Sequence, residues 1–441
     1  MLPAIASFKT VNVWSGNFGE SSYRLSFAPG ITGTKCAKAG TYRMTRSAKY
    51  QCQKSANGLR WMLTGSKNMA STATTTTTTT LAPIYLDSEI SDVSKLLATQ
   101  ECQIRDATFN SSDGSSTRSS GFPRPAQFPS SIGQLRVLVV PVNFNDLFFS
   151  GVDARSIEAT YAKVNSYFVA QSGGRAQVGV TVAPSSAWVD LGTTAEGSGF
   201  INPPQPLWDG SLFYRKVVDQ FLQKNSAAGY DVIAVMSAAS NRFYSALALP
   251  AGSTTYATGR NFTGMLIVGS SVPYWNILAH EIGHAWLGYE DLYLFRSQNE
   301  SPLGKWDLMS QTGTELSGWS RFLAGWIEPS AVRCASPTAT SRHYLTALNS
   351  ESANSRPRLL VLPLSASSAL VADYRAPNTW SPDLKTGTLV VYKVDTTVDH
   401  GNGPITLVGL IDQVGGTLSS GPIKISTKAI NAAGVVLEVG N

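Results

Sequence analysis

Cysteine, histidine and long apolar runs are scarce in this 441-residue sequence, and each scarcity excludes a class of protein. Four cysteines are too few for a fold held together mainly by disulfides. No apolar run reaches the roughly 18 residues that a membrane-spanning helix needs, so no transmembrane segment is expected. Residues 1–7 are apolar but too short for a signal peptide and follow no basic segment. Either the protein is cytosolic, or the sequence starts downstream of its true beginning.

Acidic residues are nearly absent from residues 1–80, where ten Lys or Arg face the single acid Glu20. The net charge of the whole chain is +6, so this local excess of nine leaves −3 for the remainder. Such a basic segment suits an anionic surface, such as a cell-wall polymer or lipid head groups, or is simply a soluble basic domain. No specific nucleic-acid partner is expected.

Low-complexity sequence divides the chain. Residues 71–80 are nearly all threonine and have no apolar face to bury. We therefore expect a small basic β module over 1–70, a Thr-rich linker over 71–83, and a pro-segment or spacer over 84–130. In the module, Cys36 and Cys52 lie on two predicted strands at a spacing that suits a disulfide. The spacer contains one predicted helix, 87–100, and a Ser- and Gly-rich stretch.

Helical and strand patterns alternate from about residue 131, and strand patterns alone follow Pro329. Short β-branched apolar runs predict strands, and apolar residues at helical spacing predict helices. These patterns give strands at 135–144, 178–182, 231–236 and 264–268, helices at 156–170 and 211–224, and late strands at 359–364, 369–374, 387–394 and 434–439. We therefore predict an α/β or α+β catalytic domain over 131–330. A β-rich C-terminal domain follows over 331–441, either separate or packed on the catalytic domain.

Residues 280–284 read HEIGH, which is an HExxH motif. On a helix, His280 and His284 lie one turn apart on one face, so both imidazoles can reach one ion with Glu281 beside it. Zinc held by neutral nitrogens lowers the pKa of bound water. Glu281 can then act as the general base that takes the water proton and passes it to the leaving amine. Because the chain has only four histidines, chance would rarely produce this spacing.

A catalytic zinc needs a third protein ligand and one open position. In the metzincin pattern, a glycine lies seven residues after the first histidine, and the third ligand lies ten residues after it. Here Gly288 lies eight residues after His280, and Glu290 and Asp291 lie ten and eleven residues after it, an offset of one. The Gly288-to-Asp291 spacing equals the metzincin spacing, which favours Asp291 as the ligand and leaves Glu290 as its rival. The other carboxylate would accept a hydrogen bond from a ligand imidazole.

Several segments together resemble the immune inhibitor A-type family of secreted bacterial zinc metallopeptidases. Met309, in the segment WDLMS at 306–310, looks like the Met-turn that forms an apolar floor beneath a metzincin zinc. The other matching segments are HEIGH with EDLY at 290–293, GWSRFLAGWI at 318–327, VLVVPVNFND at 137–146, YFVAQSGGR at 167–175, DYR at 373–375 and LVVYKVD at 389–395.

The resemblance implies a fold, an activity and a location. The fold class would be α+β, with a metzincin-like zinc peptidase core, the small N-terminal β module and the β-rich C-terminal domain. Zn²⁺ is the expected cofactor, bound by His280, His284 and Asp291, with Ca²⁺ as a second ion to which no residue is assigned. Together with the Thr tract and the cysteine spacing, the resemblance favours a secreted or cell-surface protein, although no signal peptide is visible.

The remaining cysteines and histidines have less specific patterns. Cys102 and Cys334 flank the catalytic region and would form a disulfide in an exported protein. Alternatives are a Cys102 thiolate that blocks the zinc in a latent form, or a cap on the zinc from Asp106 or Asp113. His343 and His400 have no partner at ligand spacing and are expected to be ordinary surface or core histidines.

Two functions fit the sequence. The first is a zinc endopeptidase that hydrolyses protein or peptide substrates by direct attack of water, without an acyl-enzyme. The second is a cell-surface binding protein that uses the basic N-terminal module and the C-terminal β domain and carries a degenerate peptidase core. The intact HExxH motif favours the first. Bond preference, activation and oligomeric state leave no readable pattern in the sequence.

Overall fold

The computed structural model describes most of the chain after residue 91 and three strands before it. The described residues are 42–44, 48–55, 58–66, 92–106, 118–149, 151–200, 210–239, 246–249, 263–268, 275–297, 300–310, 313–349 and 356–441. The chain forms two compact units, Met1–Pro83 and Ile84–Asn441. Within the described residues, no helix combines the length and apolar character needed to cross a membrane.

The first unit contains a three-stranded antiparallel sheet in the order β1-β2-β3. Its strands are β1 (Tyr42–Met44), β2 (Ala48–Ser55) and β3 (Gly58–Ser66). Cys52 is buried on β2 and is disulfide-bonded. Cys36 and the Thr tract lie outside the described residues, so their predicted pairing and linker role stay predictions.

The second unit is built on a six-stranded sheet in the order β5-β4-β7-β9-β8, with β6 paired beside β4. The pairings are parallel except between β8 and β9, which are antiparallel. The strands are β4 (Gly133–Asn143), β5 (Ala176–Val182), β6 (Val189–Asp190), β7 (Val232–Ser237), β8 (Ala246–Leu249) and β9 (Thr263–Val268).

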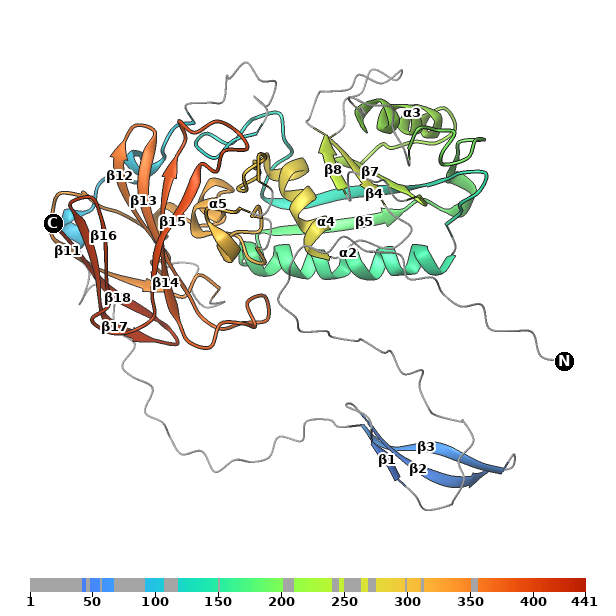
Figure 1. Cartoon of the computed structure of the whole chain (residues 1–441), viewed down its shortest axis with the longest axis horizontal. Coiled ribbons are helices and arrows are strands. Elements are labelled where there is room, and N and C mark those ends of the chain that lie inside the picture. The colour runs from blue at the N-terminus through green and yellow to red at the C-terminus, as the bar shows by residue number, and fades with distance from the viewer. Residues whose placement is uncertain are drawn as a thin grey trace. The chain divides into compact units, whose positions relative to one another are not determined.

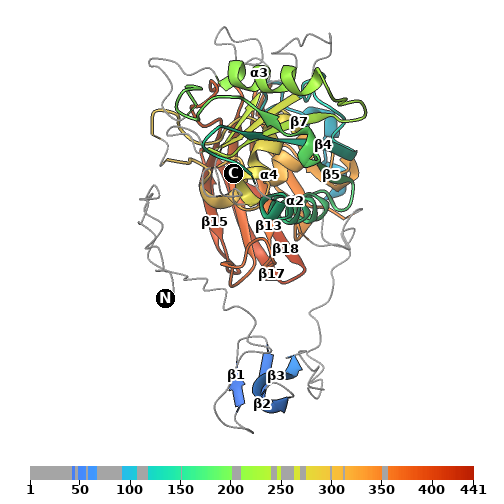
Figure 2. The same cartoon turned by 90° about the vertical axis from the view of Figure 1, so that its right-hand side faces the viewer.

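Successive side chains of the central strands point to opposite faces of this sheet, and each face packs against its own layer of helices. Val137 and Val139 of β4 pack with α2 (Gly151–Ser172) and α4 (Trp275–Ile282). Leu138 and Val140 point the other way and pack with α3 (Gly210–Leu222). Figures 1 and 2 show α3 on one side of the strands, and α2 and α4 on the other. Because side chains alternate with period two, both faces of the apolar strand are buried.

Two further sheets form the C-terminal region. One has the order β10-β12-β13-β14-β15 and the other the order β11-β18-β17-β16. Their strands are β10 (Val332–Cys334), β11 (Ser341–Thr346), β12 (Leu359–Ser365), β13 (Ser368–Arg375), β14 (Thr388–Asp395), β15 (Ile405–Ile411), β16 (Thr417–Ser420), β17 (Ile423–Asn431) and β18 (Gly434–Gly440).

The five-stranded sheet shares one core with the helical part. Leu360 and Leu362 of β12 face the four-stranded sheet, whereas Leu359 and Val361 join the core that contains α2, α4 and α5 (Gly318–Leu323). Of the two arrangements predicted for the β-rich region, the structure therefore shows the packed one. The residue ranges assigned to the individual parts stay a prediction.

Most predicted elements of the second unit are confirmed, and the fold is a mixture of helices and sheets, as expected. The sequence patterns missed the strands β6, β8, β10, β11, β15, β16 and β17. The predicted helix at 87–100 is wrong over its described part, which forms two single 3-10 turns, Val93–Lys95 and Thr99–Cys102. The intervening Leu97 donates its backbone N–H to the Cys334 carbonyl, so tertiary pairing replaces the helical bonds.

The predicted disulfide between Cys102 and Cys334 is confirmed. It ties the segment before the sheet to β10. Farther along that segment, the indole N–H groups of Trp286 and Trp319 donate to the carbonyls of Ser130 and Ser120. The predicted pro-segment or spacer is therefore attached to the second unit, with Cys102, Ile104 and Phe128 buried.

Candidate metal centre

The HExxH motif begins in α4 and ends in a π-helical turn, Gly283–Leu287. Gly288 stops the helix in the left-handed conformation, with φ of 71°, and its N–H donates to the carbonyls of Gly283 and His284. A π-turn holds one residue more than an α-turn. The extra residue that separates this sequence from the metzincin spacing is thus accommodated in the turn before Gly288.

Position 283 must be a glycine because the Met309 side chain packs against its Cα. A Cβ atom at this position would lie 2.7 Å from the sulfur of Met309, which is buried. The Met309 carbonyl accepts the N–H of Leu292, one residue after Asp291. The segment predicted as a Met-turn therefore lies against both the HExxH helix and the loop that carries Asp291.

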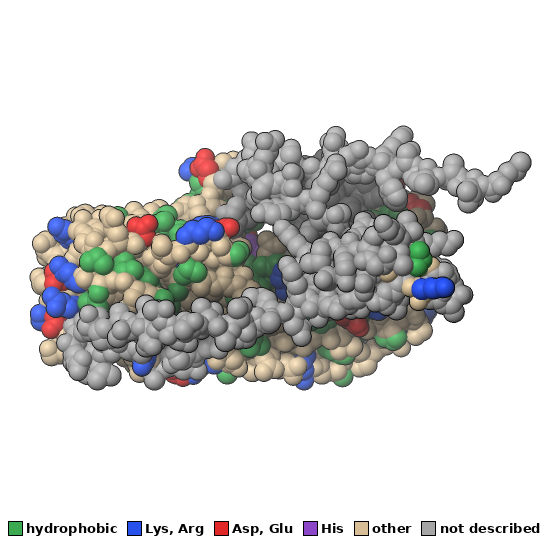
Figure 3. Space-filling view, turned by 90° about the horizontal axis from the view of Figure 1, so that it is seen from below, with side chains coloured by type: hydrophobic (Ala, Val, Ile, Leu, Met, Phe, Trp, Pro, Cys, Tyr) green, Lys and Arg blue, Asp and Glu red, His purple; other side chains and the backbone are tan. Residues whose placement is uncertain are grey.

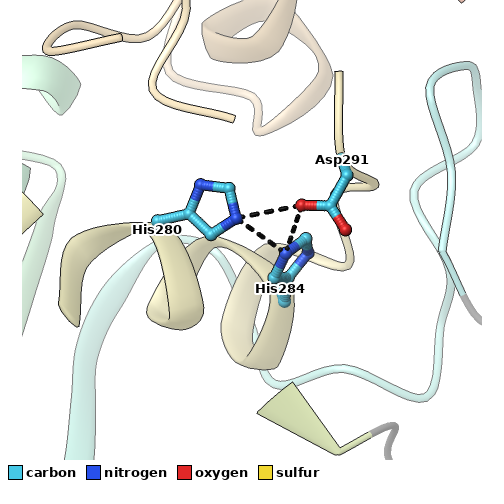
Figure 4. A group of neighbouring side chains, drawn as sticks. All are labelled: His280, His284 and Asp291. Carbon is cyan, nitrogen blue, oxygen red and sulfur yellow. Dashed lines mark hydrogen bonds and ion pairs between the residues drawn. The ribbon is translucent and has the colours of Figure 1, made fainter. Parts of the chain in front are cut away.

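Three ligand-type atoms converge next to this helix. His280 Nε2 and His284 Nε2 are 3.1 Å apart, and each lies 3.0 Å from Asp291 Oδ1. Figure 4 shows the two rings rising from the helix and the carboxylate arriving from the loop beyond it. Zinc bonds of about 2.0 Å in a tetrahedron place ligand atoms about 3.3 Å apart. The observed separations are close to one face of such a site, and the cluster has the residue types to hold a metal ion.

The backbone determines which nitrogen of each ring faces the cluster. His280 Nδ1 lies 3.1 Å from the Leu308 carbonyl, and His284 Nδ1 lies 2.6 Å from the Tyr289 carbonyl. A carbonyl only accepts, so each Nδ1 must carry the hydrogen. In the neutral rings, both Nε2 atoms then present lone pairs toward a carboxylate oxygen. Three such acceptors come this close only around a positive charge, which is either a metal ion or a proton on one Nε2 atom.

Burial and nearby charges give the two imidazoles different pKa values. Burial alone lowers the pKa of His280, but the hydrogen bond and charge of Asp291, with the charge of Glu281, raise that pKa to about 9. Burial and the positive charge of Arg118 lower the pKa of His284 to about 4. Although burial raises it, the two histidines hold the pKa of Asp291 well below its usual range. The site therefore favours a positive charge next to an ionised carboxylate.

Glu281 occupies the helix position beside His280 and is largely buried, with 9% of its surface exposed. Its negative charge raises the pKa values of His280 and Tyr293. The Tyr293 ring stacks near that of His280, with 6.4 Å between centroids. Glu281 thus lies within the electrostatic reach of the cluster.

Asp291 has further contacts that the sequence patterns did not predict. Arg118 Nη1 lies 3.7 Å from Asp291 Oδ2, on the opposite side of the carboxylate from the histidines. Burial raises the pKa of Tyr293, and the negative charge of Asp291 and a hydrogen bond to it raise that pKa further. No sequence motif pointed to Arg118, because this residue belongs to a Ser-rich stretch 173 positions before Asp291.

Glu290 points away from the cluster, although it is adjacent to Asp291. Its Oε2 lies 3.1 Å from His400 Nδ1, and burial raises its pKa. The structure thus places Asp291, and not Glu290, beside the two imidazoles. Glu290 accepts its hydrogen bond from a histidine of the β-rich region instead of from a ligand imidazole.

His343, as expected, is a core residue, and its Nε2 lies 2.8 Å from Ser341 Oγ. The alternative in which a Cys102 thiolate blocks the zinc is wrong, because the Cys102 sulfur is bonded to Cys334. The Asp106 cap is also wrong, because this carboxylate accepts from the Ser119 hydroxyl and the Ser120 N–H. Asp113 lies outside the described residues.

Comparison with known proteins gives little. No family model matches this chain, and no curated protein matches it. A crystal structure of metalloproteinase-II from Bacteroides fragilis is similar at 17% sequence identity and a TM-score of 0.28, over 64% of this chain and 77% of that chain.

Charge around the site is mixed. On the face shown in Figure 3, Lys and Arg are interspersed with Asp and Glu over the coloured part of the surface. Asp307 is fully buried and organises the floor of the site, because it accepts the backbone N–H groups of Met309 and Ser317. A buried carboxylate with several such bonds holds its loop rigidly.

Proposed function

We propose that this protein is a zinc-dependent endopeptidase with a metzincin-like site, in which His280, His284 and Asp291 bind the metal and Glu281 is the general base. The observation that carries the proposal is the convergence of two Nε2 atoms and one carboxylate oxygen within 3.1 Å of one another. Both Nδ1 atoms are engaged by carbonyls, which leaves the Nε2 lone pairs for an ion.

Two nitrogens and one carboxylate oxygen are a donor set typical of catalytic zinc, which keeps one position open. Bound there, zinc supplies a Lewis acid that polarises water and the substrate carbonyl. Glu281 would accept the proton of the attacking water and deliver it to the leaving amine nitrogen. The protein fixes this geometry through the helix, the π-turn at Gly283–Leu287 and the carbonyl contacts of the two rings.

We further propose that the protein is of the immune inhibitor A type, is exported or attached to the cell surface, and acts on protein or peptide substrates. The disulfide between Cys102 and Cys334 supports export, because such bonds persist in oxidising compartments. Binding of the basic N-terminal module to an anionic polymer is a separate proposal, testable by a cell-wall pull-down with and without residues 1–80.

The test of the proposed function is Glu281→Gln, which keeps the shape of the side chain and removes the base. Casein hydrolysis should fall by at least about 100-fold, the lower end of what a general base contributes, while bound zinc stays equimolar by metal analysis. The matched control is Glu300→Gln, the same change at an exposed position nine residues beyond Asp291. Zinc-free purified protein, or unchanged hydrolysis by Glu281→Gln, would refute the proposal.

A further inference from the structure

A histidine of the β-rich region reaches the segment that carries Asp291. His400 lies in the connection between β14 and β15, and its Nδ1 is 3.1 Å from Glu290 Oε2. The two side chains are only 14% and 5% exposed. They are 110 positions apart in sequence, so only the tertiary fold brings them together.

The connection is docked at several points in addition to this pair. Phe295 donates its backbone N–H to the Gly401 carbonyl at 2.9 Å, and its ring packs edge-on against His400. Leu294 forms a β-bridge with Asn402. The loop after β14 therefore pairs with the chain immediately after Asp291 through its backbone as well as through His400.

Two glycines allow this close approach. Gly401 has φ of 74°, and a Cβ there would lie 2.2 Å from the Phe295 ring. Gly403 has φ of 75°, and a Cβ there would lie 2.6 Å from Pro302. Both positions combine a left-handed backbone with a neighbour in van der Waals contact, which only glycine accommodates.

Asp291 is thus fixed by hydrogen bonds on either side of it in the chain. Glu290, before it, is held by His400, and Leu292, after it, donates to the Met309 carbonyl. With both neighbours held, rotation of the intervening backbone is restricted, and Asp291 Oδ1 keeps its place beside the imidazoles. Outer contacts that orient a ligand in this way are worth about 10–100-fold in metal affinity.

We propose that His400 is a positioning residue for the metal centre: by donating Nδ1–H to Glu290, it holds the Asp291 segment in ligating position. The β-rich region is then part of the metal site and not a separate binding domain. This inference rests on the proposed function, because it needs Asp291 to be a ligand.

The experiment compares two substitutions at one position in the full chain. His400→Asn keeps an N–H donor at the position of Nδ1, whereas His400→Gln carries its donor one bond farther, near the position of Nε2. Both replacements are polar and smaller than histidine, so loss of packing is similar. Zinc affinity is measured by competition with a chromophoric chelator, and folding is checked by circular dichroism and thermal melting.

We expect His400→Asn to bind zinc close to wild type and His400→Gln to bind it about 10-fold more weakly. If the Gln variant is not weaker than the Asn variant while the wild-type protein binds zinc, the inference is overturned and the proposed function stands. If the wild-type protein binds no zinc, both fall. Hydrolysis at saturating zinc gives a second readout, since restored metal occupancy should restore much of the activity lost in His400→Gln.

Discussion

Gly288 ends the helix of the HExxH motif three residues before Asp291, and its replacement by alanine tests how this end is built. The residue has φ of 71°, which costs an L-amino acid about 1–2 kcal/mol. An added Cβ would also meet the Phe128 ring at 2.7, 2.8 and 3.3 Å. Phe128 is buried, so this overlap adds about 1–3 kcal/mol.

The backbone cannot easily move away from that overlap, because the Gly288 carbonyl accepts the N–H of Ser119 at 2.8 Å. We therefore expect Gly288→Ala to lower the free energy of unfolding by about 2–5 kcal/mol. Zinc affinity should fall as well, since any shift at Gly288 moves Asp291.

Gly325 provides a matched control. It follows α5 with φ of 73°, and an added Cβ would have nothing within 4 Å. Gly325→Ala should therefore cost only the backbone share, about 1–2 kcal/mol, and leave zinc affinity unchanged. Urea unfolding followed by tryptophan fluorescence measures both variants and reports mainly on the second unit, because only Trp14 and Trp61 precede it. Equal losses for the two variants would refute the role assigned to the Phe128 contact.

The remaining predictions concern the third ligand, the disulfide and pH. Asp291→Ala should weaken zinc binding by a larger factor than Glu290→Ala in the chelator competition, and the reverse order would make Glu290 the ligand. Replacing Cys102 and Cys334 together by serine should cost about 5 kcal/mol in chain entropy, because the bond closes a loop of 232 positions; a loss under about 1 kcal/mol in urea would contradict this. Burial lowers the pKa of His343 to about 4 from 6.5. Between pH 6.5 and 4, His343 is therefore protonated in the unfolded chain but not in the folded chain. The free energy of unfolding should fall by about 3 kcal/mol as the pH drops from 6.5 to 4. His284, whose pKa is also lowered to about 4, adds to the same pH dependence. His343→Gln should therefore reduce the slope and not abolish it, and an unchanged slope would exclude a contribution from His343.

Local sequence patterns predicted the elements that depend on neighbours in the chain. The apolar runs of β4, β7 and β12–β14 and the helical spacing of α2 and α3 were readable because burial on both faces or on one stripe leaves a period in the sequence. The short strands β10 and β16 were missed, because three or four residues are too few to show a period. The segment before Cys102 was misread as a helix because two of its N–H groups, those of Asp92 and Leu97, donate to carbonyls of β11 and β10, more than 200 positions away.

The HExxH motif by itself determined that His280, Glu281 and His284 share one helical turn, because that spacing is a property of the helix. Which of Glu290 and Asp291 lies beside the imidazoles was decided only by the tertiary structure. This placement depends on the π-turn before Gly288 and on the hydrogen bond between His400 and Glu290. The direction in which a side chain points after the end of a helix is determined by the residues that pack around it. Here those residues include His400 of the β-rich region, far along the chain.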